Sequence, residues 1–245
     1  MSDSPRISIV TPMMNEAENV AQMIDEVAEG CAELAPFELI IVDDGSTDDT
    51  ARIALGLQGA HPWVRVVQHA KTCGQSAAVL SGVKAARADI IATLDGDLQN
   101  PPSEVANLVA PLLNDSSCRI GLVAGQRIKR MDTGSKRIAS RAANSLRRRI
   151  LRDDTHDTGC GAKAFRRDLF LRLPYFDHIH RYLPALTKRE GFDVVTVPVT
   201  DRARNGGASH YTNLGRVLVG ASDLFGVWWL MRRRRLPTLT ESSDR

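Results

Sequence analysis

The sequence predicts an α/β protein with a largely parallel central sheet. Short apolar runs alternate with segments long enough to form helices, which is the pattern of β–α–β crossovers. Several of these runs pass directly into polar residues, and in open parallel sheets ligands bind beyond the carboxyl ends of the strands. The 245 residues, 43% of them hydrophobic, are enough for one globular domain with an appended element.

The expected elements follow one another from the amino terminus. Strands are expected at 7–11, 39–43, 64–68, 90–94 and 120–124, because each is a short run rich in Val, Ile or Leu. Helices are expected between them, at 16–29, 48–57, 75–87 and 103–113. The chain contains neither a Gly-x-Gly-x-x-Gly fingerprint nor a phosphate-binding P-loop, which argues against a dinucleotide oxidoreductase and a P-loop kinase.

The strand expected at 90–94 leads into the most informative motif, Asp95-Gly96-Asp97-Leu98-Gln99. Alternate residues of an extended segment point the same way, so Asp95, Asp97 and Gln99 can direct three oxygen ligands at one cation. Such hard ligands suit Mg²⁺ or Mn²⁺, and magnesium usually takes one or two carboxylates together with substrate phosphates. The alternative is a solvated Asp-Gly turn. Two acids and an amide at alternate positions favour the metal site.

Two other strand ends are also polar. Ser46 and Thr47 can cap the helix that follows them, which accounts for the hydroxyls but not for the two acids before them. Adjacent carboxylates at the end of a buried strand need partners, and a nucleobase or a ribose offers donors at that place. The first of these ends is Thr11-Pro12-Met13-Met14-Asn15-Glu16, and the second is Asp43-Asp44-Gly45-Ser46-Thr47-Asp48-Asp49-Thr50.

The segment from Thr93 to Pro101 resembles the metal-binding signature of the polyprenyl-phosphate glycosyltransferases of glycosyltransferase family two, whose best-known branch is the dolichol-phosphate mannosyltransferases. Separate motifs extend this resemblance from about Ile7 to about Tyr211. It implies a GT-A type nucleotide-diphospho-sugar transferase fold. Met14 stands where the family commonly has a tyrosine. The nucleotide-sugar site that the resemblance implies consists of Pro12, Asn15, Glu16, Asp43, Asp44, Ser46, Gly74, Gln75 and Asp95.

The acceptor is indicated by what the chain lacks. Many family-two enzymes that glycosylate a hydroxyl carry a Glu-Asp pair, with aspartate as base, on the helix occupied here by residues 180–184. That pair is absent. A phosphate monoester has a second pKa of about 6 and attacks without a base, provided that cations hold it in line with the anomeric carbon. Residues 119–172 contain fifteen Lys and Arg against five Asp, a local charge of +10 within a net +3.

By resemblance, Arg127 closes a motif after the fifth strand, and 136–144 matches a helix that receives the lipid phosphate. The segment from Arg204 to Tyr211 resembles the closing Arg-x-x-Gly-x-Ser-Lys-Tyr loop, with His210 in place of lysine. Asp157 either caps a helix or pairs with an arginine, or it contacts the donor sugar or assists the acceptor. The catalytic assignments are Asp97, Arg127 and Arg204, and the acceptor-phosphate assignments are Arg127, Lys136, Arg137, Ser140, Asp157, Arg202, Arg204 and Ser209, with Arg141 a further candidate.

The carboxyl-terminal stretch 214–231 is too short, and too interrupted by Asp223 and glycines, to span a membrane comfortably. Trp228 and Trp229 beside four arginines suit a helix lying among lipid headgroups, and the alternative is a helix packed on the domain itself. We therefore expect a GT-A catalytic domain over 1–211 and an amphipathic, membrane-interface helix with a basic tail over 212–245. The amino terminus lacks an apolar signal core, so we expect a cytoplasmic chain attached peripherally to the inner face of the membrane, with a membrane-anchoring partner or a homo-oligomer as further options.

The expected function is inverting, metal-dependent transfer of a sugar from a nucleotide-sugar donor to a polyprenyl phosphate, with Mg²⁺ or Mn²⁺ as cofactor. One alternative is a glycosyltransferase with a soluble saccharide or protein acceptor. A second is a nucleotide- or nucleic-acid-binding module without catalysis. Against nucleic acid, the basic region has only Phe165 and Phe170 for base stacking. The four cysteines form no Cys-x-x-Cys pair, which argues against zinc and against a redox dithiol.

Overall fold

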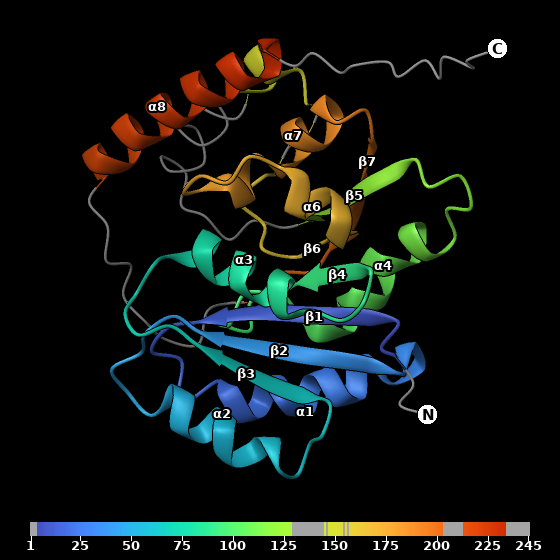
Figure 1. Cartoon of the computed structure of the whole chain (residues 1–245), viewed down its shortest axis with the longest axis vertical. Coiled ribbons are helices and arrows are strands. Elements are labelled where there is room, and N and C mark those ends of the chain that lie inside the picture. The colour runs from blue at the N-terminus through green and yellow to red at the C-terminus, as the bar shows by residue number, and fades with distance from the viewer. Residues whose placement is uncertain are drawn as a thin grey trace, which may run out of the picture.

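A seven-stranded sheet in the order β3-β2-β1-β4-β6-β5-β7 forms the centre of the molecule (Figure 1). The computed structural model describes residues 4–128, 145, 147–153, 155, 157–202 and 213–233. Within these residues the strands are β1 Ile7–Met13, β2 Phe37–Asp43, β3 Val64–Gln68, β4 Ile90–Thr93, β5 Ile120–Arg127, β6 Lys163–Arg166 and β7 Asp193–Val199. The α-helices are α1 Val20–Gly30, α2 Thr50–Gln58, α3 Gln75–Ala85, α4 Val105–Leu113, α6 Arg167–Arg172, α7 Leu183–Arg189 and α8 Asn213–Arg232, and the 3₁₀ turns are η1 Ala32–Leu34, η2 Pro102–Glu104 and η3 Ile179–Arg181.

The predicted α/β class and mostly parallel sheet are confirmed. Strands β1 to β4 pair in parallel, as do β5 and β7, whereas β6 runs antiparallel to both β4 and β5. All five predicted strands are present, and β3 occupies the predicted residues. The sequence did not predict β6 and β7. The first has only four residues with a charge at each end, and the second carries Pro198 at the edge of the sheet, where a missing N–H donor is tolerated.

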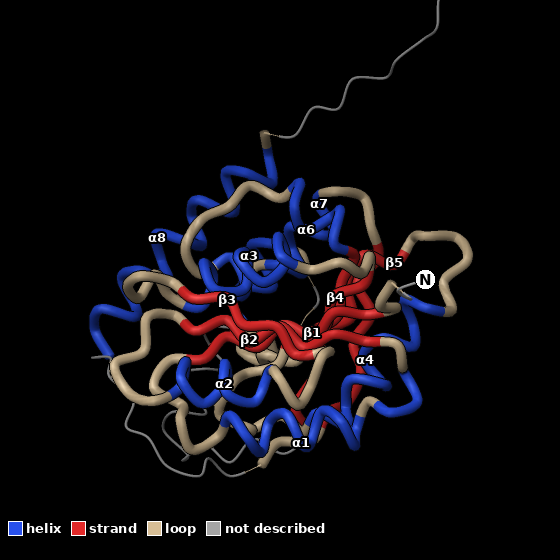
Figure 2. Tube along the Cα trace, turned by 60° about the horizontal axis from the view of Figure 1, so that its bottom comes forward, coloured by secondary structure: helices blue, strands red, loops and turns tan. Residues whose placement is uncertain are grey.

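The helices form a layer on each face of the sheet (Figure 2). On one face α1, α2 and α4 bury apolar residues against β1, β2 and β4. On the other face α3, α6 and α7 pack against a second apolar cluster. Because β1, β2, β3 and β4 are parallel, their carboxyl ends meet at one edge, which the loops before α1, α2 and α3 surround.

Helix α8 packs on the second cluster. Val227 is buried there, and Leu224, Trp228 and Met231 pack around it. Phe225 is 65% exposed, so another side of the helix carries an apolar surface. Helix α8 therefore packs on the domain, as the alternative prediction had it. Some of its apolar side chains nevertheless stay exposed. Within the described part of the chain, no helix has both the length and the apolar character that a membrane span requires.

Strand β4 ends at Thr93, two residues before Asp95. The segment after it turns: Leu98 has a φ of 59°, in the left-handed region. The expectation that an extended segment carries Asp95, Asp97 and Gln99 on one side is therefore wrong, because the alternation of side chains ends with the strand. The relative positions of these three side chains are therefore set by the turn after β4.

Candidate active site

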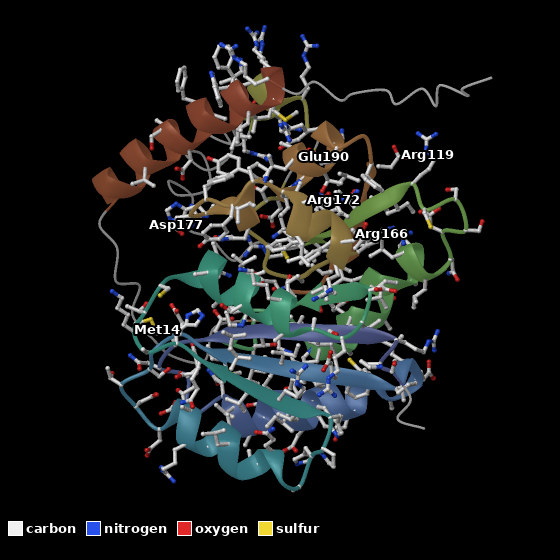
Figure 3. The ribbon with its side chains drawn as sticks, viewed as in Figure 1. Met14, Arg119, Arg166, Arg172, Asp177 and Glu190 are labelled. Atoms are coloured by element: carbon white, nitrogen blue, oxygen red, sulfur yellow. The ribbon has the colours of Figure 1, made fainter. Side chains whose placement is uncertain are left out.

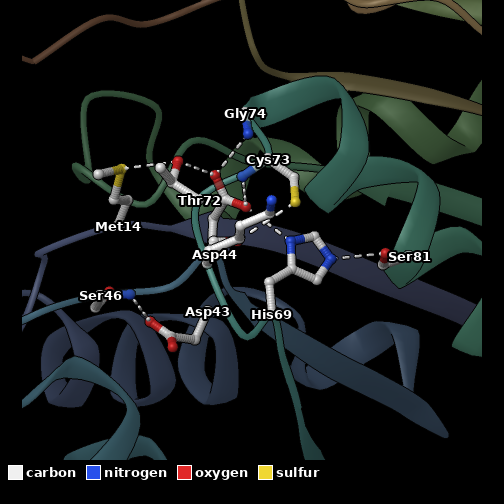
Figure 4. Close-up of polar contacts among 10 residues, drawn as sticks. Met14, Asp43, Asp44, Ser46, His69, Thr72, Cys73, Gly74 and Ser81 are labelled. Atoms are coloured by element: carbon white, nitrogen blue, oxygen red, sulfur yellow. Dashed lines mark hydrogen bonds and ion pairs between the residues drawn. The ribbon is translucent and has the colours of Figure 1, made fainter.

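The end of β2 places Asp44 among four hydrogen-bond partners (Figure 4). Its Oδ1 lies 2.7 Å from His69 Nδ1 and accepts the Cys73 N–H at 2.9 Å. Its Oδ2 accepts the Thr72 hydroxyl at 2.9 Å and the Gly74 N–H at 2.8 Å. Burial raises the pKa of this carboxyl, but the hydrogen bonds outweigh it and hold the pKa below its usual value. Asp44 is therefore ionised, and it fixes the start of the loop that leads into α3.

The loop after β1 is fastened to the loop after β2. The Asn15 N–H donates to Ser46 Oγ at 2.9 Å, and Asn15 Oδ1 accepts the Thr47 N–H at 2.8 Å. Asp43 Oδ1 in turn accepts the Ser46 N–H at 3.3 Å. Ser46 and Thr47 therefore do not cap α2, which begins only at Thr50. The structure brings together the polar residues that the sequence singled out at these two strand ends.

Glu16 also joins these two loops. Its N–H donates to Thr50 Oγ1 at 2.9 Å, and its carboxylate accepts a hydrogen bond from the Asn19 side-chain amide. Met14, at the same edge, is 47% exposed and its sulfur lies 3.6 Å from the Thr72 hydroxyl. Figure 3 shows Met14 and Asp177 at the edge where β1 to β3 end, with Arg119 and Arg166 on the other side of the molecule. The basic stretch is therefore not all directed at this edge.

Asp95 lies beyond the end of β4 in a different environment. Gln75 Nε2 donates to its Oδ1 at 2.8 Å. Burial raises the pKa of Asp95 to about 6, and the like charge of Asp97 adds to the rise, whereas Lys163 and Arg127 oppose it. Asp97 accepts the Gln99 N–H at 3.2 Å. A partly buried carboxylate with a second carboxylate as neighbour is stabilised by a cation.

The segment 157–162, called the strap below, passes close to Asp95. Its Gly161 lies directly against the Asp95 carboxylate. The Thr93 hydroxyl donates to the Gly161 carbonyl at 2.7 Å, which holds the strap against β4. A Cβ on Gly161 would lie only 2.1 Å from Asp95 Oδ2 and 2.2 Å from Oδ1. Only glycine leaves room for the carboxylate at this position.

Two adjacent residues bridge the two acidic strand ends. Gly74 donates its N–H to Asp44, and Gln75 donates its side-chain amide to Asp95. Gly74 has a φ of 89°, which a residue with a side chain rarely adopts, and α3 begins directly after it. Free N–H groups at the start of a helix attract phosphate. The arrangement can hold a nucleotide along the strand ends, with its diphosphate near Asp95.

Asp95 and Asp97 fit a divalent cation of the magnesium class. Their oxygen atoms are the hard ligands that Mg²⁺ and Mn²⁺ prefer, and two carboxylates leave positions for substrate phosphates. The repulsion between them, seen in the raised pKa of Asp95, is relieved by a bound cation. Gln99 follows the left-handed turn at Leu98, so its side chain as third ligand stays a prediction.

Two polar residues behind Asp95, the buried Lys163 and the half-buried His180, were not recognised in the sequence. Lys163, 3% exposed, donates to the carbonyls of Cys160 and Thr158, and so ties the strap to β6. His180 Nδ1 lies 2.7 Å from Ser76 Oγ. Burial lowers the pKa of His180 well below its usual value, and the charge of Lys163 adds to this, so the imidazole is neutral. A single lysine in a short strand gives no sequence signal for this position.

Arg127 forms an ion pair with Asp157, so Asp157 has the arginine partner that one of the alternatives predicted. Its Nε and Nη2 donate to the two Asp157 carboxylate oxygens at 2.7 and 3.0 Å, and its Nη1 lies 4.0 Å from Asp201 Oδ2. This bidentate pair fixes the orientation of the Arg127 guanidinium. The positive charge of Arg127 opposes the rise in the pKa of Asp95. Arg202 instead directs its guanidinium to Glu26 on α1, at 2.8 Å from both oxygens, so its contact with an acceptor phosphate stays a prediction. The remaining acceptor candidates, Lys136, Arg137, Ser140, Arg141, Arg204 and Ser209, lie outside the described residues.

A cavity of about 280 Å³ opens beside Gln75, between η3 and α8. His178 Nδ1 lies 3.0 Å from Asp223 Oδ2, and the Tyr182 hydroxyl donates to the Gly220 carbonyl at 3.3 Å, so both contacts hold α8 over this space. The cavity lies next to the Asp95 site and can hold a second substrate there. Its lining includes Gly74, Gln75, Asp177, His178, His180, Arg181, Tyr182, Val219, Gly220 and Asp223.

Comparison with known proteins agrees with this geometry. Residues 8–173 match the family model described as "Glycosyl transferase family 2". The chain is 34% identical over 241 residues to dodecaprenyl-phosphate galacturonate synthase of Rhizobium johnstonii, covering 96% of this chain and 70% of that protein. It is 31% identical over 211 residues to undecaprenyl-phosphate 4-deoxy-4-formamido-L-arabinose transferase of Sodalis glossinidius, covering 84% and 63%.

Solved structures support the fold. Glucosyl-3-phosphoglycerate synthase of Mycobacterium tuberculosis, crystallised with Mn²⁺, uridine diphosphate and glucosyl-3-phosphoglycerate, superimposes with a TM-score of 0.68 at 23% identity, over 93% of this chain and 80% of that one. The same enzyme has been crystallised with Mg²⁺ and uridine diphosphate. The predicted GT-A type fold is thereby confirmed.

Proposed function

Because the chain belongs to glycosyl transferase family 2 and is thus a glycosyltransferase, we propose that it transfers a sugar from a nucleotide-sugar donor to a polyprenyl phosphate with inversion. Two of its relatives are named for transfer to dodecaprenyl and undecaprenyl phosphate. The chain spans 70% and 63% of the length of these two relatives, so the acceptor is part of the proposal. Inversion follows if the acceptor displaces the nucleotide in a single step.

The observation that carries the donor site is the bridge made by Gly74 and Gln75 between Asp44 and Asp95. It gives one continuous polar surface from the end of β2 to the end of β4. We assign the base and ribose to the side of Asn15, Asp43 and Asp44, and the diphosphate to the side of Asp95. Mg²⁺ or Mn²⁺ held by Asp95, Asp97 and Gln99 would neutralise the charge that develops on the departing nucleotide.

The acceptor enters through the cavity beside Gln75. A prenyl phosphate arrives as a dianion, so what it requires is positive charge and alignment rather than a base. Arg127 supplies such a charge, and its pairing with Asp157 fixes its direction before the substrate binds. Arg204 is the second catalytic arginine of the proposal, and Lys136, Arg137, Ser140, Arg202 and Ser209 complete the phosphate site.

We further propose that residues 1–211 are the catalytic domain and that 212–245 attach it to the inner face of a membrane. Phe225 and Trp229 on α8 are 65% and 48% exposed. The Arg232 and Arg233 guanidinium groups lie 4.3 and 5.6 Å from the ring centres of Trp228 and Trp229. Aromatic rings with adjacent cations suit the headgroup layer of an anionic membrane.

The proposal is tested by transfer from a panel of nucleotide sugars to a short-chain prenyl phosphate in the presence of Mn²⁺. Asp97→Ala should abolish transfer, because the cation loses a ligand, while the melting temperature stays close to that of the wild type. Asp49→Asn, an exposed acid on the loop before α2, is the matched control and should keep activity. Transfer that stays Mn²⁺-dependent in Asp97→Ala would contradict the assignment.

The acceptor is tested by competition between a prenyl phosphate and a free saccharide. We expect only the prenyl phosphate to be glycosylated. If the saccharide is glycosylated and the prenyl phosphate is ignored, the lipid acceptor is wrong, while the donor site is unaffected. Membrane attachment is tested by sedimentation with anionic vesicles, where Phe225→Ser with Trp229→Ser should reduce binding. Leu55→Ser on α2, where the side chain is about as exposed as Trp229, should not reduce it.

A further inference from the structure

Three side chains with metal-binding chemistry converge at the ends of β2 and β3. Asp44 follows β2, His69 follows β3, and Cys73 lies in the loop before α3. A carboxylate oxygen of Asp44, a ring nitrogen of His69 and the sulfur of Cys73 all lie within 4.8 Å of one another. Figure 4 shows the three side chains together. The three residues are separated by 25 and 4 positions in the chain, so only the fold forms the cluster.

The ligand types differ from those at Asp95 and Asp97. A thiolate, an imidazole and a carboxylate are typical of zinc, whereas two carboxylates are typical of magnesium. Tetrahedral zinc, with bonds of about 2.0–2.3 Å, keeps its ligand atoms roughly 3.3–3.6 Å apart. The present separations reach that geometry if the Cys73 side chain moves inward and the 2.7 Å contact of Asp44 with His69 opens slightly. Cys73 is exposed, so its side chain is able to move and a cation is able to enter there.

His69 already has the second partner that metal-binding histidines usually have. Its Nε2 lies 2.8 Å from Ser81 Oγ on α3, while Nδ1 faces Asp44. A hydrogen bond on the far nitrogen of the ring fixes its orientation and leaves the near nitrogen for a metal. With a metal on Nδ1, the imidazole carries its proton on Nε2 and donates a hydrogen bond to Ser81 Oγ, and the Cys73 thiol releases its proton to solvent.

The anchoring of the loop does not depend on the contacts that a cation would replace. Oδ2 of Asp44 keeps the hydrogen bonds from Thr72 and Gly74, and Oδ1 keeps the one from the Cys73 N–H. Two contacts have to give way, the one between Asp44 Oδ1 and His69 and the one from the Cys73 thiol to the Lys71 carbonyl at 3.3 Å. The cluster can therefore bind a cation without loss of the hydrogen bonds by which Asp44 anchors the loop.

We propose that Asp44, His69 and Cys73 form a second cation site, selective for thiophilic divalent metals such as Zn²⁺, and that metal bound there competes with the nucleotide sugar. The competition rests on the proposed function, in which Asp44 lies beside the base and ribose. Metal binding itself does not. Zinc would thus inhibit the enzyme at a place distinct from the site that Mg²⁺ or Mn²⁺ uses.

Binding is tested with Cd²⁺ on the full chain, because a cadmium thiolate has an ultraviolet charge-transfer absorption. The wild type should show a saturable band that is lost in Cys73→Ser and weakened more than about tenfold in affinity in His69→Gln. Cys118→Ser removes the other exposed thiol and should leave the band unchanged. A band that persists in Cys73→Ser, or that is missing in the wild type, overturns the site whether or not the protein transfers sugar.

Competition is tested by titrating Zn²⁺ into the transfer reaction at saturating Mn²⁺. The half-inhibitory concentration should rise at least tenfold in Cys73→Ser and should not change in Cys118→Ser. Because the nucleotide chelates zinc equally in both proteins, the difference reports the site. If Cd²⁺ binds through Cys73 but inhibition is the same in both variants, the cation site stands and the competition with the donor is wrong.

Discussion

Asp44 and Asp95 lie beyond the ends of two parallel strands that flank β1, yet their surroundings are opposite. Asp44 accepts hydrogen bonds from four partners on the loop before α3 and at the end of β3, and its pKa is lowered. Asp95 has Gln75 as hydrogen-bond partner and the like charge of Asp97 nearby, and its pKa is raised to about 6. The protein stabilises the first charge by itself. The second is left for a cation to stabilise.

This difference predicts that Asp44 maintains the shape of the site and that Asp95 binds the cation. A carboxylate saturated with protein donors contributes to stability and fixes the loops around the nucleotide. A carboxylate whose charged form is disfavoured by burial and by a second carboxylate favours binding of a cation, because the cation stabilises the negative charge. Substitution of the two residues should therefore affect different quantities.

The largest expected effect is the loss of the cation in Asp95→Asn. An amide keeps the shape but removes the charge, so the affinity for Mn²⁺ should fall by on the order of 100-fold or more, measured by the paramagnetic resonance of free Mn²⁺. The melting temperature without metal should not fall, because the raised pKa of Asp95 means that its charged form is unfavourable in the folded protein. A strong loss of stability without loss of metal would reverse the roles of the two carboxylates.

Gly161→Ala should weaken metal binding by more than about tenfold, through Asp95. The new Cβ would lie 2.1 Å from Asp95 Oδ2, so either the carboxylate or the strap has to shift. Gly59→Ala, where a Cβ meets nothing within 4 Å, is the matched control for the substitution itself. Unchanged Mn²⁺ affinity in Gly161→Ala would show that the strap does not position Asp95.

Metal affinity should depend on pH through Asp95. Since its pKa is raised to about 6, a proton competes with the cation below that pH, and the affinity for Mn²⁺ should be roughly tenfold weaker at pH 5 than at pH 7. Asp44, whose pKa is lowered, stays ionised over this range and should not contribute. A flat affinity between pH 5 and pH 7 would contradict the raised pKa.

The smallest effect on the cation is expected in Asp44→Asn, which should act on stability instead. Loss of charge-assisted hydrogen bonds should lower the free energy of unfolding by about 2 kcal/mol at pH 7, measured by urea denaturation. Because the folded pKa is lowered, this stabilisation is present above about pH 4, the unfolded value, and fades as the pH falls through the folded value. Mn²⁺ affinity should be retained. An equal loss of metal in Asp44→Asn and Asp95→Asn would remove the distinction between them.

Local patterns in the sequence were sufficient for the first half of the fold. Strand β3 lies at the predicted residues, and the polar ends of β1 and β2 do meet, because parallel strands bring their carboxyl ends to one edge. The extended course assumed for Asp95 to Gln99 was wrong, since the strand ends at Thr93. The segment after Thr93 turns instead, and its left-handed residue, Leu98, has no sequence signal.

The sequence by itself determined the α/β class, the family and the acidic motif of the proposed metal site, because these depend on residue type and on short-range periodicity. Only the tertiary structure decided which charge each residue meets: that Arg127 is paired with Asp157, that Arg202 turns to Glu26, and that Lys163 lies behind Asp95. It also brought Cys73 to His69 and Asp44, although the cysteine spacing had argued against zinc. The physical reason is that ligand sets and pKa values depend on distances of a few ångströms across the sheet, which packing fixes and the order of residues does not record.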